Sequence, residues 1–138
     1  MLILVPRSAA GYLDIRQARG FDAAGNYAAA AGAYTSAAER LPWESSLWEK
    51  AGNAYLNGKD YHSADYAYGN AVQRHALSPN GYMGWGDSVF ALGNAGFAEN
   101  LWNGLVDKGV NPAMLWPPLA ALDRARCPEK QALSTLET

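Results

Sequence analysis

The residues that could do chemistry are few in this sequence and lie far apart. His62 and His75 are thirteen residues apart with no cysteine nearby, and two potential ligands do not make a metal site. Cys127 is the single cysteine, so there is no internal disulfide. It precedes a proline and has no neighbouring residue that would activate it as a nucleophile. We therefore expect no metal site and no catalysis.

Two further patterns, a pair of glycines and a pair of glutamates, do not indicate a chemical function either. Gly84 and Gly86 lie inside a helical pattern and do not follow a strand, as a phosphate-binding loop would require. Glu39 and Glu44 flank a loop, where solvated carboxylates are the simpler interpretation. The sequence predicts a protein that is not an enzyme and has no cofactor.

Length and composition indicate one folded domain. A chain of 138 residues with 49% hydrophobic residues can bury a core. Only 17% of the residues are charged and the net charge is −2, whereas nucleic-acid binders normally carry a basic face. We expect no nucleic-acid partner.

The first residues leave two alternatives open. Residues 1–5 are apolar but too few to cross a bilayer, and Pro6 and Arg7 end the run. No basic region precedes them, so they are not a complete signal peptide. Residues 1–8 are either a disordered or tag-derived tail or the end of a longer membrane anchor. We expect no membrane insertion by this segment, and a location that is cytoplasmic or in the soluble part of an anchored protein.

The elements that position all these residues repeat along the chain. A 34-residue shift aligns large with large and small with small side chains. Four of the aligned sets are Phe21, Tyr55 and Val89; Tyr27, Tyr61 and Ala95; Ala30, Ala64 and Ala98; and Tyr34, Tyr68 and Trp102. A period of this length is typical of a helix–turn–helix solenoid. The sequence therefore predicts an all-α repeat fold.

The same register predicts the domain organisation. The repeat domain would span residues 9–126, with repeats at 11–44, 45–78 and 79–111 and a partial fourth at 112–126 that acts as a capping helix. Residues 127–138 would form a short terminal helix or a frayed tail. The first pair of helices is expected at 9–23 and 27–40, with Asn26 and Asp60 as N-caps of second helices. Gly109 stands where a C-terminal cap glycine is expected.

Gly52 is expected to mark a close contact between two helices. Glycine inside a helix costs about 1 kcal/mol relative to alanine, so a compensating contact is needed. Tyr61, Ala64 or Tyr68 of the partner helix could supply it.

The second copy resembles the tetratricopeptide repeat. The resemblance is carried in order by Trp48, Ala51, Gly52, Tyr55, Ala64, Tyr68, Ala71 and Pro79. It extends over about residues 12–122, although the first copy has Asp14 and Gln17 in place of Trp48 and Ala51. A helical repeat of another family is the alternative. The resemblance implies a right-handed superhelix whose concave groove, lined by the first helix of each pair, holds peptide segments.

Helical geometry then predicts which residues form the groove wall. The stripe beside the buried face includes Tyr12 and Ser46. The eight of its residues that we expect to contact a partner are Ile15, Arg19, Glu49, Asn53, Leu56, Met83, Asp87 and Phe90. A grip on a terminal carboxylate, known in the family, is not expected, because Ile15 and Glu49 stand where cations are needed. We expect a non-catalytic module that binds a protein or peptide partner in this groove. The alternative is a structural spacer or self-assembly element of a longer protein, with association through the solenoid ends.

Overall fold

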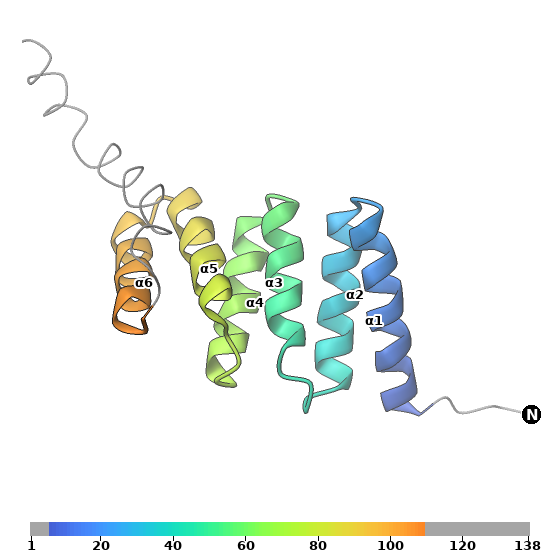
Figure 1. The fold of residues 1–138 in the computed structure, drawn as a ribbon. Helices are drawn as coiled ribbons and strands as arrows, with labels where there is room; N and C mark the ends of the chain where they lie inside the picture. Colours follow the sequence, from blue (N-terminus) through green and yellow to red (C-terminus); the bar gives the residue numbers. More distant parts are fainter. Residues whose placement is uncertain (1–5, 110–138) are drawn as a thin grey trace, which may run out of the picture.

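The computed structural model describes residues 6–109, which fold into helices without any strand. The helices are α1 (Arg7–Ala23), α2 (Tyr27–Arg40), α3 (Leu47–Asn57), α4 (Tyr61–Gln73), α5 (Pro79–Ala91) and α6 (Ala95–Asp107). They stand side by side in chain order, and each packs against the next (Figure 1). The prediction of an all-α helical repeat solenoid is confirmed.

The predictions about the two chain ends can be compared with the structure only where they fall within residues 6–109. Helix α1 begins at Arg7, directly after Pro6, two residues before the start expected from the sequence. Proline at this position loses nothing, because the first amides of a helix have no intrahelical partner. The partial repeat at 112–126, Cys127 and the segment at 127–138 lie outside the described residues.

The three pairs begin their second helices in the same way. Asn26, Asp60 and Asn94 each accept a hydrogen bond from the amide three residues on, at 3.3, 3.3 and 3.1 Å. The residue before each cap has a left-handed backbone, with φ of 77° at Gly25, 62° at Lys59 and 92° at Gly93. The predicted N-caps at Asn26 and Asp60 are confirmed. Gly109 is also left-handed, with φ of 87°, just after the C-terminal end of α6.

Within each pair, the helices meet where a small residue faces a large aromatic one. A Cβ atom on Gly52 would lie 2.7 Å from Cε1 of Tyr68, which confirms the predicted close contact and identifies its partner. Gly86 has the same relation to Trp102, since its Cβ would lie 2.6 Å from Cε2 of that ring. The two contacts occupy equivalent positions in successive repeats. In the first pair the corresponding residues are Ala18 and Tyr34, and both are buried.

The buried residues form two separate cores. The N-terminal core, between α1 and α4, consists mainly of alanine with a few large residues, namely Tyr34, Leu41, Leu47 and Trp48. The C-terminal core contains Val89, Ala98, Trp102 and Leu105, and aromatic residues of α5 and α6 pack against it. Alanine favours helix formation and allows helices to approach closely. The two ends of the solenoid are therefore held together by different kinds of side chain.

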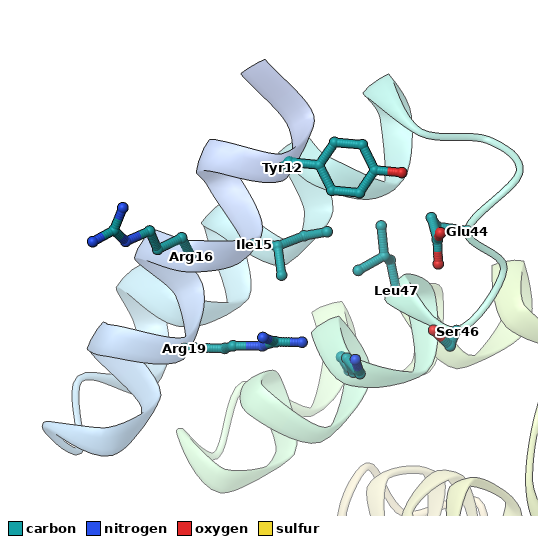
Figure 2. Close-up of a pocket in the computed structure, with 8 residues that line it drawn as sticks. Tyr12, Ile15, Arg16, Arg19, Glu44, Ser46 and Leu47 are labelled. Atoms are coloured by element: carbon teal, nitrogen blue, oxygen red, sulfur yellow. The ribbon is translucent and has the colours of Figure 1, made fainter. Parts of the chain in front are cut away.

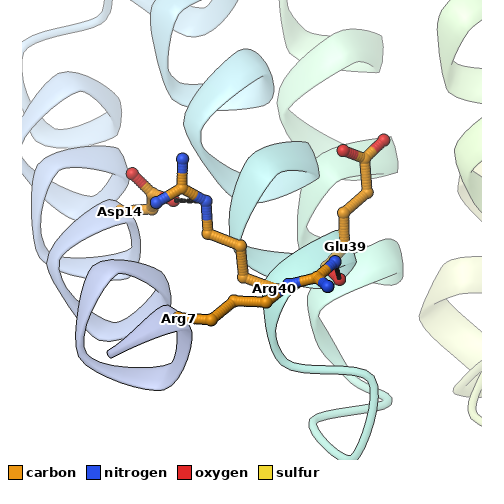
Figure 3. A network of polar contacts seen from close by, with 4 residues as sticks. All are labelled: Arg7, Asp14, Glu39 and Arg40. Carbon is orange, nitrogen blue, oxygen red and sulfur yellow. Dashed lines mark hydrogen bonds and ion pairs between the residues drawn. The ribbon is translucent and has the colours of Figure 1, made fainter. Parts of the chain in front are cut away.

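A cation at the end of each second helix contacts a residue of the first helix of the same pair. The three contacts are repeat-equivalent: Asp14–Arg40, Trp48–Arg74 and Tyr82–Lys108. The first is an ion pair with 3.4 Å between Oδ2 and Nε (Figure 3). The other two place the cation 5.4 and 3.8 Å from the centre of an aromatic ring. Asp14, which departs from the tetratricopeptide pattern, therefore keeps the same partner position as the aromatic residues that it replaces.

Candidate functional site

A cleft of about 500 Å³ lies between α1 and α3. Its lining comes from α1, from the α2–α3 loop and from α3: Tyr12, Ile15, Arg16 and Arg19; Glu44 and Ser46; and Leu47 and Lys50. Figure 2 shows Ile15 and Leu47 pointing toward one another, with Arg19 extending from α1 toward α3. The cleft is on the face formed by the first helices α1, α3 and α5, which we call the first-helix face.

The floor of the cleft is apolar and its rim is charged. Leu47 is buried and Ile15 is half-buried against the N-terminal core. Tyr12 is 52% exposed, and Arg16, Arg19 and Lys50 are exposed as well. Glu44 is the one carboxylate among the described residues of the lining. The cleft therefore combines apolar surface with an excess of positive charge.

Side-chain size at two repeat positions explains why the first-helix face is hollow here. Leu47 and Lys50 of α3 correspond, one repeat further on, to Gly81 and Gly84 of α5. A Cβ on Gly84 would lie 2.5 Å from the Tyr68 hydroxyl and 3.1 Å from Cδ2 of Leu56. Because both positions are glycine, α5 packs directly against α3, whereas α1 and α3 scarcely touch.

The structure places two of the predicted groove residues, Ile15 and Arg19, in the cleft. Glu49 lies at the α3–α5 junction, where its carboxylate accepts hydrogen bonds from the Ser78 amide, at 3.0 Å, and from the Ser78 hydroxyl. Ser78 is the N-cap of α5. Glu49 therefore holds the start of a helix in place.

The other predicted groove residues lie on α3 and α5, and several of them are used in packing. Leu56 is half-buried beside Gly84. Met83 and Phe90 are half-buried against the C-terminal core, with the Phe90 ring 5.8 Å from that of Trp102. Of the eight predicted residues, two line the open cleft, and Glu49, Leu56, Met83 and Phe90 are used in packing.

Asn53 has a partner inside the fold. The Tyr68 hydroxyl donates a hydrogen bond of 2.7 Å to its Oδ1 atom. Tyr68 is fully buried, and burial raises its pKa well above the ordinary value, with the negative charges of Glu49 and Asp87 acting in the same direction. The phenol is therefore neutral and able to donate this bond at any physiological pH.

Asp87 is the third residue in the register of Arg19 and Asn53. Its side chain reaches the surface, but nearby atoms displace enough water to raise the pKa of the carboxyl above its ordinary value. The sign of the charge in this register thus changes along the first-helix face, from positive on α1 to negative on α5.

Sequence reasoning missed four of the residues that line the cleft, namely Arg16, Glu44, Leu47 and Lys50. One signal was present in the register, since Arg16 and Lys50 occupy the same position of successive repeats and both are cations. Their equivalence puts a cationic residue on each of the two helices that border the cleft, although the guanidinium of Arg16 points away from α3 (Figure 2).

The possible metal ligands of residues 6–109 do not come together. Within that range no cluster of three or more histidine, cysteine, aspartate or glutamate side chains could bind a metal ion. His62 and His75 are both exposed and lie outside the cleft. Across the same residues, no helix has the length and apolar character that crossing a membrane requires.

Comparison with known proteins does not identify a family. No protein-family model matches the chain, and no curated protein is significantly similar to it.

Proposed function

We propose that this protein is an interaction module of the tetratricopeptide kind, which binds a segment of a partner protein on its first-helix face. The family assignment is supported by the 34-residue register, by the helix pairs and by the small-to-aromatic contacts at Gly52 and Gly86. The binding function is supported by the α1–α3 cleft.

The cleft is the observation that carries the proposal. Its volume of about 500 Å³ falls within the roughly 300–1,000 Å³ that is usual for ligand sites. Apolar surface surrounded by charged and aromatic side chains is the usual composition of a recognition site. We assign no reaction to it, because the described lining contains no histidine or cysteine.

Selection of random peptides on the purified chain tests this function. The wild-type protein is expected to enrich binders, and Tyr12→Ser combined with Arg19→Ser is expected to weaken them, since both side chains line the cleft. Asn53 is unsuitable for this purpose because its loss would remove the partner of the Tyr68 hydroxyl.

A matched control changes two exposed residues of α4, His62→Ala with Gln73→Ala, and should leave binding unchanged. Circular dichroism verifies that all variants remain helical. Failure to enrich any peptide, combined with concentration-dependent sedimentation of the chain, would instead favour the self-assembly alternative.

A further inference from the structure

The cationic side chains of the cleft have no polar partner among residues 6–109. Arg16 and Arg19 lie one turn apart on α1, and Lys50 lines the cleft from α3. Arg19 extends toward α3, whereas the guanidinium of Arg16 points away from it (Figure 2). None of these three side chains makes a hydrogen bond or an ion pair with another of residues 6–109. A local excess of positive charge attracts anionic groups, and here it occurs in a chain whose net charge is −2.

The apolar floor lies between these charges. Ile15 and Leu47 point toward one another (Figure 2). The exposed ring of Tyr12 lies next to Ile15 on α1. An apolar side chain that entered here would have cations on both walls. Arginine binds carboxylates through two parallel N–H groups, so each arginine can hold one acidic side chain in a defined geometry.

We propose that the occupant of the cleft is an internal segment of a partner protein in which acidic side chains flank an apolar one. This inference rests on the proposed function and specifies the partner. Cations on two walls can bind two carboxylates at once, and two acidic side chains of one segment can supply them without a chain terminus. The carboxylates pair with Arg19 and Lys50, and the apolar side chain contacts Ile15 and Leu47.

The third repeat does not share the preference of the cleft for acidic side chains. In α5 the position of Arg16 and Lys50 is Gly84, and the position of Arg19 is Asp87. An acidic segment that continued toward α5 would meet a carboxylate in place of a cation. Repulsion of this kind is a common source of specificity, and here it places the acidic part of the segment at the N-terminal end of the first-helix face.

Selection of a peptide library fused through its C-terminus tests the proposal, since no peptide then has a free terminal carboxylate. Binders of the wild-type chain are expected to carry two or more acidic residues around an apolar one. Arg19→Glu combined with Lys50→Glu should reverse this preference toward basic peptides. It should also weaken the original binders by at least about tenfold, as loss of close charge pairs does.

A matched charge reversal completes the design. Lys59→Glu changes an exposed lysine in the α3–α4 turn, outside the cleft, and should affect binding much less than Lys50→Glu alone. Should the double reversal lose its helical circular dichroism, Arg19→Gln with Lys50→Gln removes the same charges without adding new ones.

The outcomes separate this inference from the proposed function. Binders without an excess of acidic residues would overturn the acidic segment but leave peptide binding intact. An equal effect of Lys59→Glu would show attraction by overall charge and would also overturn it. A library that yields no binder at all would overturn both proposals.

Discussion

The α1–α3 and α3–α5 junctions are built from the same repeat positions, but the first is an open cleft and the second is closed by packing. Leu47 and Lys50 project from α3 toward α1 and border a cleft, whereas Gly81 and Gly84 bring α5 against α3. Repeat proteins derive their stability from contacts between neighbouring units. The comparison shows that two side chains per repeat decide whether such a contact is open to a ligand or closed by packing.

The two cores differ in a related way. The N-terminal core distributes its burial over many alanines, while the C-terminal core depends on a few large residues, above all Trp102. Polar bonds connect the two parts, including one of 2.6 Å from the Trp85 indole N–H to Asp65 on α4. Loss of one large residue should therefore matter more in the C-terminal part.

The largest expected effect comes from breaking the C-terminal core. Trp102 is 1% exposed, and Trp102→Ala should lower the free energy of unfolding by about 3–5 kcal/mol. Since contacts in a solenoid are local, amides of α5 and α6 should lose hydrogen-exchange protection before those of α1 to α4. A uniform loss of protection would contradict the division into two cores.

A residue exchange between the junctions should have the next largest effect. Gly84→Lys gives α5 the residue that α3 has at the same position, and its Cβ would lie 2.5 Å from the Tyr68 hydroxyl. We expect a loss of about 1–3 kcal/mol in denaturant unfolding, because overpacking forces neighbouring atoms apart.

The matched variant is Lys50→Ala, which changes an exposed residue bordering the cleft. Its unfolding free energy should stay within about 0.5 kcal/mol of the wild type, as for most surface substitutions. Equal losses for the two variants would show that the junctions are packed alike.

The smallest expected effect concerns the charge at the closed junction. The pKa of Asp87 is raised in the folded protein, so the folded state holds its proton more tightly than the unfolded state does. Its contribution to stability is present below the unfolded pKa of about 3.9 and is lost as the pH rises through the folded pKa.

Asp87→Asn should therefore raise the thermal midpoint slightly at pH 7 and leave it unchanged at pH 3. Thermal melts followed by circular dichroism at the two pH values measure the difference. A larger gain at pH 3 than at pH 7 would reverse the sign and exclude desolvation of this carboxyl.

The sequence by itself determined the helical repeat. Its 34-residue register, its turn residues and the caps Asn26 and Asp60 act locally, through helix propensity and backbone geometry, so they can be read without a structure. The close contact at Gly52 was predictable for the same reason, since an unfavourable residue inside a helix requires compensation.

Tertiary structure alone decided which part of the predicted groove is an open cleft. Helical geometry places Arg19, Asn53 and Glu49 in one stripe, but it does not show that Asn53 accepts a bond from Tyr68 or that Glu49 binds Ser78. Those partners come from other helices, at distances set by the packing of whole repeats. The cleft exists because α1 and α3 are held apart by side chains while α5 is not, and only the assembled helices determine that spacing.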